Sequence, residues 1–305
     1  MQPRPLKQVL VTGAQGQLGL ALASLQPQAQ AQGLQLLLAD KNTLNISKPD
    51  HIARYLDAHD IAAVVNTAAY TQVDQAENQA DLAWQINAHA PALLAQACRQ
   101  RHITLLHIST DYVFDGSSTL PWSEDDPTRP LSVYGKSKLA GEQAVLAALP
   151  DALIIRSSWL FSQFGNNFLK TMITLAQTHD TLRIVDDQIG GPTYAPHLAL
   201  ALLNMLQQHF SATGLVPGTY HFAGQPYISW YGFAQEIFLQ AQRNGILTKI
   251  PQLQPISSAD YHSAAVRPKN SCLSQNKLNY AIGKQENDWR VGLLPSLITN
   301  GIVWP

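Results

Sequence analysis

The chain has 305 residues, of which 46% are hydrophobic and only 13% are charged. This length suits one large domain or two lobes around a shared cleft, and the apolar content is that of a folded globular protein. Lys and Arg number 20 against 21 Asp and Glu, so the net charge is −1. A protein that binds nucleic acid electrostatically needs a basic excess, and we therefore expect no nucleic-acid partner.

The two cysteines and the short apolar runs are typical of a cytoplasmic protein. Cys98 and Cys272 are too few for a disulfide framework, and their spacing matches no zinc site. The apolar run after Met1–Lys7 ends at Val11, which is too early for a signal peptide. No stretch reaches the roughly 18 apolar residues of a membrane span. We expect a cytoplasmic protein with no membrane partner.

The first half of the chain alternates between apolar strands and helices. Strands are predicted at residues 8–11, 34–39, 62–66, 103–109 and 153–157. Helices are predicted at residues 16–25, 47–59, 81–101 and 133–149, the second with Ser47 as its N-cap and Pro49 in its first turn. Strands that are apolar throughout and separated by helices indicate a parallel sheet covered on both faces. Residues 1–157 are thus predicted to form a doubly wound, Rossmann-type α/β domain.

The second half has a looser pattern. Helices are predicted at 168–179, 197–210 and 230–243, the last capped by Ser229, and strands at 182–185 and 220–222. Residues 251–274 are rich in Pro, Ser and Asn and are predicted to be loops. We expect residues 158–305 to form mainly a smaller C-terminal α/β lobe for the substrate, with segments near 182–223 returning to the first domain.

A glycine-rich turn joins the first strand to the first helix. Residues 12–19 read Thr-Gly-Ala-Gln-Gly-Gln-Leu-Gly, a TGxxGxxG pattern. Glycines at these positions allow the tight turn, the approach of a pyrophosphate to the backbone and the packing of helix on strand, and the helix N-terminus attracts the phosphates. The segment predicts a dinucleotide site that includes Gly13, Gln15, Gly16, Gln17 and Leu18.

Two neighbouring residues at the end of the second strand bear on the choice of cofactor. Asp40 lies about 20 residues after the glycine turn, where an acid that binds the adenosine ribose is expected. Its carboxylate would accept hydrogen bonds from a free 2′-hydroxyl and so favour NADH. Lys41 would instead pair with the 2′-phosphate of NADPH. A simple turn residue is the other interpretation of Asp40, and both cofactors remain open.

Tyr134 and Lys138 are predicted to share one face at the start of a helix, because they lie four residues apart. A phenol titrates near pH 10, and a nearby ammonium lowers its pKa toward values useful for proton transfer. Thr110 ends the fourth strand, at the carboxyl edge of the sheet where such folds bind ligands. A hydroxyl at this edge can stabilise an oxygen on which charge develops.

Together these features resemble the extended short-chain dehydrogenases/reductases and, within them, the dTDP-4-dehydrorhamnose reductase family. The resemblance is carried by the segments 66–77, 109–116, 133–142, 156–159, 165–168, 187–193 and 267–271. It implies reduction of dTDP-4-dehydro-L-rhamnose to dTDP-L-rhamnose by NADPH or NADH. Tyr134 would protonate the incipient alkoxide, Lys138 would hold the nicotinamide ribose and tune Tyr134, and Thr110 would polarise the ketone.

The resemblance also implies binding roles for residues outside the catalytic group. The residues expected to line the cofactor are Asn66, Ala68, Ala69 and Tyr70. Those expected to border the sugar, besides Thr110, are Asp111, Tyr112, Trp159 and Asn167. Arg267 is the candidate for the substrate diphosphate, because a guanidinium binds phosphate oxygens in pairs; an arginine that only packs its loop is the alternative.

One departure from the family concerns a metal. Some members dimerise through magnesium held by glutamates on the first helix and near the 187–193 segment. This chain carries Ala21 and Pro196 at what look like those positions. Magnesium requires oxygen ligands, so we expect no such metal, and both a monomer and a homodimer remain open.

Two other functions compete with this interpretation. The first is another nucleotide-sugar enzyme, such as an epimerase or a dehydratase. Epimerases usually keep NAD tightly bound. Dehydratases generally carry a pair of acidic residues after the threonine at the strand end, whereas here Asp111 is followed by Tyr112. The second is a non-catalytic subunit that binds the dinucleotide, because the regulatory subunit of methionine adenosyltransferase resembles the same family. The presence of Thr110, Tyr134 and Lys138 favours catalysis.

Overall fold

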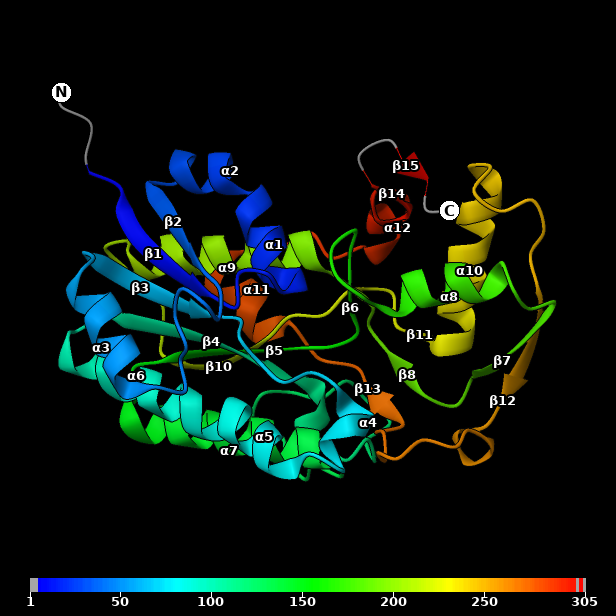
Figure 1. Ribbon diagram of the computed structural model, residues 1–305, viewed down its shortest axis with the longest axis horizontal. Coiled ribbons are helices and arrows are strands. Elements are labelled where there is room, and N and C mark those ends of the chain that lie inside the picture. Colours follow the sequence, from blue (N-terminus) through cyan, green and yellow to red (C-terminus); the bar gives the residue numbers. More distant parts are fainter. Residues whose placement is uncertain (1–4, 300–301, 304–305) are drawn as a thin grey trace.

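A six-stranded sheet lies at the centre of the larger part of the molecule (Figure 1). The computed structural model describes residues 5–299 and 302–303, so the outermost residues of the two predicted lobes lie outside the described residues. Every neighbouring pair in the sheet is parallel. In spatial order the strands are β10 (Gly218–His221), β5 (Leu153–Ser157), β4 (Thr104–Thr110), β3 (Ile61–Asn66), β1 (Lys7–Thr12) and β2 (Leu34–Ala39).

Helices cover both faces of this sheet, which confirms the doubly wound α/β fold (Figure 1). One face carries α1 (Gln17–Ser24), α2 (Gln26–Ala31), α9 (Ala195–His209) and α11 (Asn276–Ile282). The other carries α3 (Pro49–Asp57), α6 (Ala90–Gln100) and α7 (Val133–Ala148). Successive residues of a strand point to opposite faces. In β1, Val9 and Val11 therefore join the first core and Leu10 the second, and all three are fully buried.

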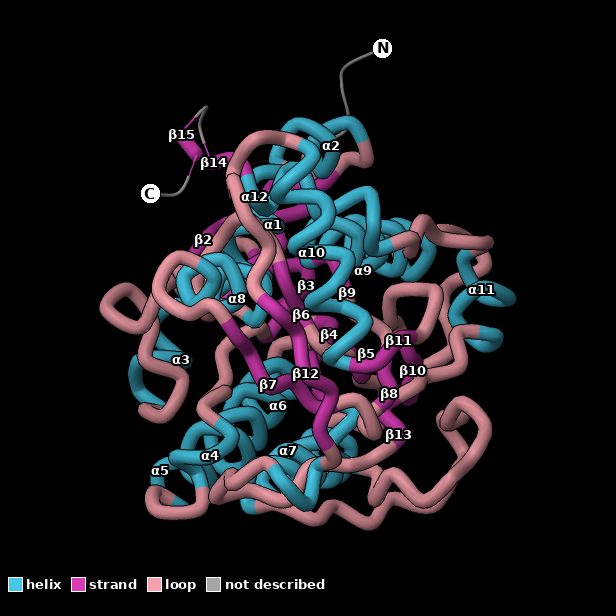
Figure 2. The backbone as a smooth tube through the Cα atoms, turned by 90° about the vertical axis from the view of Figure 1, so that its right-hand side faces the viewer, coloured by secondary structure: helices cyan, strands magenta, loops and turns pink. Residues whose placement is uncertain are grey.

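The smaller part of the molecule has its own apolar core, built on helices α8 (Phe168–Ala176), α10 (Trp230–Arg243) and α12 (Leu293–Leu297). Strands β7 (Thr181–Val185) and β12 (Gln252–Ile256) form a parallel pair there, side by side in Figure 2. The short strands of this part are β6 (Leu160–Phe161), β8 (Ile189–Gly190), β9 (Thr193–Tyr194), β11 (Ile228–Ser229), β13 (Asn270–Ser271), β14 (Ile298–Thr299) and β15 (Ile302–Val303). Strand β8 lies between β11 and β13.

Short helical turns connect these elements. The remaining α-helices are α4 (Val73–Ala76) and α5 (Ala80–Trp84), followed by a π-helical turn at Gln85–His89. Turns of 3₁₀ helix occupy Asp111–Val113, Ser258–Asp260 and Trp289–Gly292. In the described part of the chain, the structure contains no helix with both the length and the apolar character to cross a membrane.

Three local predictions need correction. Residues 251–274 are not all loop, because β12 pairs with β7; it has this one neighbour, so Pro255 is tolerated in the strand despite lacking an N–H. Ser47 does not cap α3: its own N–H donates to Oδ1 of Asn45 (3.0 Å), and Lys48 occupies the N-cap without a side-chain bond. The helix predicted at 81–101 is interrupted by the π-helical turn. Ser229, by contrast, caps α10 as predicted, with Oγ accepting from N of Gly232 (3.0 Å).

Candidate active site

The glycine turn is shaped by close backbone contacts on one side and open space on the other. Gly13 adopts a φ of +66°, and a Cβ there would lie 2.7 Å from the backbone of Ala68. A Cβ on Gly19 would lie 2.6 Å from the backbone of Gly13 and Ala14. At Gly16 the nearest such atom is the oxygen of Gly13 at 3.2 Å. Gly19 thus serves the packing of α1 on the turn after β1, and Gly13 lets that turn approach the backbone after β3, whereas Gly16 leaves room for a pyrophosphate beside the N-terminus of α1.

A pocket of about 280 Å³ adjoins this turn and brings together most of the predicted cofactor residues. The predicted residues that line it are Gly13, Gln15, Gly16, Asp40, Lys41, Ala68 and Ala69. Sequence reasoning missed the others, which are Leu44, Asn45, Ile46, Ser47, Thr67 and Ile86. The signal available in the sequence was the two apolar residues Leu44 and Ile46, a few positions after the end of the second strand. An apolar pocket with a few polar groups next to a phosphate cradle fits the adenosine half of a dinucleotide.

Both carboxylate oxygens of Asp40 already have protein partners. Oδ1 accepts from N and Oγ1 of Thr43, each at 2.8 Å, and Oδ2 accepts from Nε2 of Gln15 at 2.7 Å. The hydrogen bonds from Thr43 lower the pKa of Asp40, so it stays ionised. Lys41 is exposed at the rim of the same pocket. Of these two neighbouring charged groups, the Lys41 ammonium is therefore more available to a ligand than the Asp40 carboxylate.

Gln17 and Asn167 are placed together, although the sequence assigns one to the cofactor and the other to the sugar. Nδ2 of Asn167 donates to Oε1 of Gln17 (2.9 Å), which also accepts from Oγ of Ser162 (3.0 Å). Nε2 of Gln17 donates to the carbonyl of Leu160 (3.1 Å). Oδ1 of Asn167 caps α8 by accepting from N of Lys170. Both side chains thus join the glycine turn to the 160–167 segment.

Of the other residues predicted to line the cofactor, Leu18 and Asn66 point into the protein, and Tyr70 makes an exposed hydrogen bond. Leu18 is buried in the core between α1 and the sheet. Asn66 is fully buried; its Oδ1 accepts from Oγ1 of Thr12 (2.6 Å), and its Nδ2 lies 3.0 Å from Nδ1 of His107. Its amide therefore links β1, β3 and β4 rather than facing the pocket. The hydroxyl of Tyr70 donates to Oε1 of Gln79 (3.2 Å).

The fold brings Thr110 and Tyr134 together at the carboxyl edge of the sheet. Tyr134 lies in the first turn of α7, whose N-cap, Ser132, accepts from N of Gly135 (3.1 Å). A Cβ on Gly135 would lie 2.3 Å from the carbonyl oxygen of Tyr112, so glycine lets α7 begin directly against the turn after β4. The Thr110 side chain lies close enough to the Tyr134 phenol to lower its pKa. The ring of Tyr112 packs edge-on against that of Tyr134, with centroids 5.4 Å apart.

The electrostatics of Tyr134 differ from the sequence prediction. Burial raises its pKa to about 12, and the Thr110 side chain opposes this shift only in part. Burial also lowers the pKa of Lys138 to about 8. Nζ of Lys138 donates to the carbonyl of Ile108 at 2.6 Å. The expectation of a lowered phenol pKa is thus wrong for the described structure, because desolvation dominates and the charge of Asp111 raises the pKa further.

Asp111 is a buried carboxyl beside the two hydroxyls. Its residue is 2% exposed, and Oδ1 accepts from Oγ1 of Thr110 (3.1 Å). Oδ2 is buried without a hydrogen bond of standard geometry in the described part of the protein. Burial raises the pKa of Asp111 to about 7, although the hydroxyls of Ser271 and Thr110 oppose the shift. Thr110, Asp111, Tyr112 and Tyr134 thus form one contiguous polar group.

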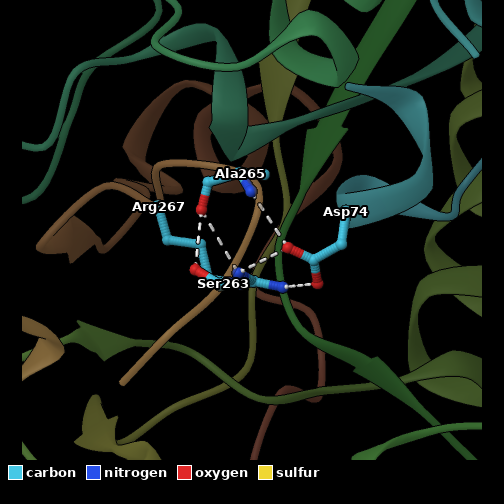
Figure 3. Close-up of polar contacts among 4 residues, drawn as sticks. All are labelled: Asp74, Ser263, Ala265 and Arg267. Atoms are coloured by element: carbon cyan, nitrogen blue, oxygen red, sulfur yellow. Dashed lines mark hydrogen bonds and ion pairs between the residues drawn. The ribbon is translucent and has the colours of Figure 1, made fainter. Parts of the chain in front are cut away.

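The other two predicted substrate residues have partners that the sequence did not reveal. The ring of Trp159 stacks on that of Trp230, with centroids 3.6 Å apart, and its backbone has a φ of +48°, which is uncommon outside glycine. Arg267 forms a two-pronged ion pair with Asp74, with Nη2 2.5 Å from Oδ2 (Figure 3). Trp230 is far from Trp159 in the sequence, and Asp74 is far from Arg267, so no local pattern could have identified these two partners.

No three His, Cys, Asp or Glu residues within 5–299 and 302–303 are grouped so that they could hold a metal ion. Ala21 is buried in α1, and Pro196 lies in the first turn of α9. Neither side chain offers an oxygen ligand.

Comparisons with known proteins place these features in a family. The sequence profile of the family described as RmlD substrate binding domain matches residues 7–300. The chain is 41% identical to a dTDP-4-dehydrorhamnose reductase of Aggregatibacter actinomycetemcomitans, over 94% of this chain and 97% of the relative. It is 35% identical to a reductase of the same name from Sinorhizobium fredii, over 96% of each. A crystal structure of a dTDP-4-dehydrorhamnose reductase from Bacillus anthracis in complex with NADP superposes with a TM-score of 0.85, at 36% identity over 95% of this chain and 98% of that one.

Proposed function

The chain belongs to the RmlD substrate binding domain family, and we propose that it reduces the C4 ketone of dTDP-4-dehydro-β-L-rhamnose to give dTDP-L-rhamnose, with NADPH or NADH as the hydride donor. The relatives that carry this name match the chain almost from end to end. The observation that carries the proposal is the convergence of the Thr110 and Tyr134 hydroxyls at the edge of the sheet that also holds the dinucleotide pocket, with Lys138 one helical turn after Tyr134 in α7.

Tyr134 is proposed to be the proton donor of this reaction. The bound dinucleotide supplies a hydride to the carbonyl carbon. Because the pKa of Tyr134 is raised to about 12, the phenol is protonated at neutral pH and is in the form that a reduction requires. The Thr110 hydroxyl lies next to the phenol, so when it turns away from Oδ1 of Asp111 it can donate to the ketone oxygen together with Tyr134 and stabilise the charge that develops there.

Lys138 is proposed to assist Tyr134 electrostatically. The lysine is 2% exposed, and its pKa of about 8 keeps most of it protonated at neutral pH. A buried positive charge stabilises the phenolate that remains once Tyr134 has given up its proton. The remaining N–H donors of Lys138, besides the one on Ile108, are available to the hydroxyls of a nicotinamide ribose.

Asp111 and Tyr112 are proposed to border the sugar, because they adjoin Thr110 and Tyr134 directly. Trp159 is proposed to border the sugar as well, and Arg267 is proposed to contact the substrate diphosphate. Asn167 and Gln17 support the substrate segment through their mutual hydrogen bond.

All proposed catalytic residues come from one chain, which is compatible with a monomer and with a homodimer. We assign the reaction to the cytoplasm, and the two free, buried cysteines support this assignment.

The direct test is oxidation of NADPH and of NADH in the presence of enzymatically generated dTDP-4-dehydro-L-rhamnose, with the product identified by mass and sugar analysis. We expect dTDP-rhamnose to accumulate in step with the oxidised cofactor. Protein that binds the dinucleotide but oxidises none of it with this substrate would contradict the proposal and favour a binding subunit. Purified protein that already carries tightly bound NAD would favour an epimerase.

A further inference from the structure

The guanidinium of Arg267 is held through one of its two hydrogen-bonding edges (Figure 3). Nη1 donates to Oδ1 of Asp74 (3.1 Å) and Nη2 to Oδ2 (2.5 Å), so the carboxylate occupies the edge formed by the two terminal nitrogens. Nη1 also reaches the carbonyl of Ala265 (3.4 Å). A guanidinium has five N–H groups. Within the described residues, the N–H of Nε and the second N–H of Nη2 have no protein acceptor, and these two form the other edge.

The same carboxylate also holds the backbone that carries Arg267. Oδ1 of Asp74 accepts from N of Ala265 (3.1 Å). Ser263 donates from Oγ to the carbonyl of Ala265 (2.8 Å), which closes this turn (Figure 3). Asp74 lies in α4, far from Arg267 in the sequence but directly against it in space. One side chain therefore fixes both the backbone and the guanidinium of a segment that arrives from the C-terminal part of the chain.

Arg267 lies at the border of the catalytic group. Its charge and that of Asp74 both act on Tyr112, whose ring packs against that of Tyr134. Further along the same segment, the hydroxyl of Ser271 lowers the pKa of Asp111. A Cβ on Gly116 would lie 2.4 Å from N of Lys269, so the segment also packs against the loop after β4.

The exposure of the pair fits a site that binds an anion. The Arg267 side chain is 19% exposed and that of Asp74 is 45% exposed. A cation this deeply buried needs a fixed anionic partner, because its desolvation is otherwise uncompensated. Nε of Arg267 has no hydrogen-bond acceptor in the described residues and is not one of their fully buried unpaired polar atoms, so the second edge of the guanidinium is reachable from solvent. Two parallel N–H donors on one edge match two oxygens of a phosphate group.

We propose that Asp74 is a positioning residue for the nucleoside-diphosphate part of the substrate: it holds Arg267 so that the Nε–Nη2 edge receives two diphosphate oxygens. The inference rests on the proposed function, which makes the substrate a nucleotide sugar. In this arrangement the carboxylate and the diphosphate bind opposite edges of one guanidinium and do not compete for it. The segment 263–267 is thereby held in the same place with and without substrate.

The test is calorimetric titration of the full-length protein with dTDP and, separately, with thymidine, which has the base but no phosphate. Asp74→Asn removes the charge with almost no change of shape, and we expect it to weaken dTDP binding about 10- to 100-fold while leaving thymidine unchanged. Arg267→Lys keeps the charge but loses the paired donors, and we expect a loss at least as large. The double variant should bind dTDP no more weakly than Arg267→Lys alone, because Asp74 acts through Arg267.

The matched control is Asp57→Asn, which breaks another Asp–Arg pair, with Arg101. It should bind dTDP like the wild type. If Asp74→Asn does not fold, Asp74→Glu, which displaces the carboxylate by one methylene, serves in its place and should also weaken dTDP. In turnover, Asp74→Asn should raise KM for the nucleotide sugar far more than it lowers kcat, and leave the cofactor KM unchanged.

Unchanged dTDP affinity in Asp74→Asn overturns the proposal, and so does tighter binding, which would mean that Asp74 competes with the diphosphate. A wild-type protein that binds neither dTDP nor UDP overturns it as well. Failure of the proposed function is distinguishable from these outcomes. If dTDP or UDP binds in an Asp74-dependent way but dTDP-4-dehydrorhamnose is not reduced, the reaction is wrong and the role of Asp74 stands.

Discussion

Asn167 donates a hydrogen bond from Nδ2 to Oε1 of Gln17 at 2.9 Å, across 150 positions of the chain. Gln17 begins α1 directly after Gly16 of the glycine turn, and Asn167 is the N-cap of α8 in the smaller part of the molecule. Ser162 shares the same acceptor oxygen. The N-terminus of the helix that is proposed to face the cofactor pyrophosphate is thus tied directly to the segment that carries the proposed substrate residues.

This link predicts energetic coupling between Gln17 and Asn167. Gln17→Ala removes three hydrogen bonds and should lower the free energy of unfolding by about 1–3 kcal/mol. Asn167→Ala removes the helix cap as well and should cost at least about 1 kcal/mol. Urea unfolding of both single variants and the double variant should give a coupling energy of about 0.5 kcal/mol or more.

Gln28→Ala, at an exposed position on α2, is the control for this cycle and should leave the unfolding free energy nearly unchanged. Strictly additive effects of Gln17→Ala and Asn167→Ala would show that the two side chains act independently. That result would argue against the link as a determinant of how the two parts of the chain are joined.

Replacement of Tyr134 by Phe should abolish proton transfer but preserve the shape of the site and the binding of the dinucleotide. The phenylalanine ring keeps the packing against Tyr112, so the site retains its shape. We expect kcat to fall about 100- to 10,000-fold with dinucleotide affinity unchanged. Steady-state kinetics and a fluorescence titration with NADPH measure the two quantities. Tyr280→Phe is the control, since Tyr280 is 96% exposed, and turnover near the wild-type level in Tyr134→Phe would rule out this proton donor.

The choice between NADPH and NADH should depend mainly on Lys41. Both oxygens of Asp40 are already hydrogen-bonded, whereas Lys41 is exposed beside the adenosine pocket. Lys41→Ala should therefore weaken NADPH about tenfold by removing a charged partner of the 2′-phosphate, with little change for NADH. Equilibrium titrations of both cofactors measure this, with Lys284→Ala as the control. Equal losses for the two cofactors would place the discrimination elsewhere.

Asp111 should make the protein less stable as the pH rises from about 4 to about 7. Burial raises its pKa from 3.8 to about 7, so in this window the folded protein holds a proton that the unfolded chain has lost. The contribution is fully present below the unfolded pKa and is lost toward the folded one, by up to about 1.4 kcal/mol per pH unit. Buried histidines such as His221, whose pKa is lowered to about 3, act in the opposite direction in the wild type.

The effect of Asp111 is therefore isolated as a difference between proteins. The free energy of unfolding of Asp111→Asn minus that of the wild type should rise steadily across this window. For Asp57→Asn the difference should be flat there, because a hydrogen bond from Arg101 lowers the pKa of Asp57 and its contribution is complete above the unfolded pKa. A flat difference for Asp111→Asn would mean that this carboxyl is ionised in the folded protein.

The sequence by itself determined the fold class and the positions of most elements. Apolar strands that must be covered on both faces dictate a parallel sheet between helix layers, and the order of strands and helices follows from local periodicity. The glycine turn, the Tyr134–Lys138 spacing on one helix face and the cap at Ser229 are also local patterns. A local pattern depends on neighbours within a few positions, so it can be recognised without the tertiary structure.

Only the tertiary structure decided what each polar side chain contacts. Asn66 contacts His107 inside the protein, Gln17 accepts a hydrogen bond from Asn167, and Arg267 pairs with Asp74, 193 positions away. The direction of the Tyr134 pKa shift was also a tertiary property, because it is set mainly by burial. Hydrogen-bond partners and desolvation arise from segments that the fold brings together, whereas residue type and spacing report only what a side chain is able to do.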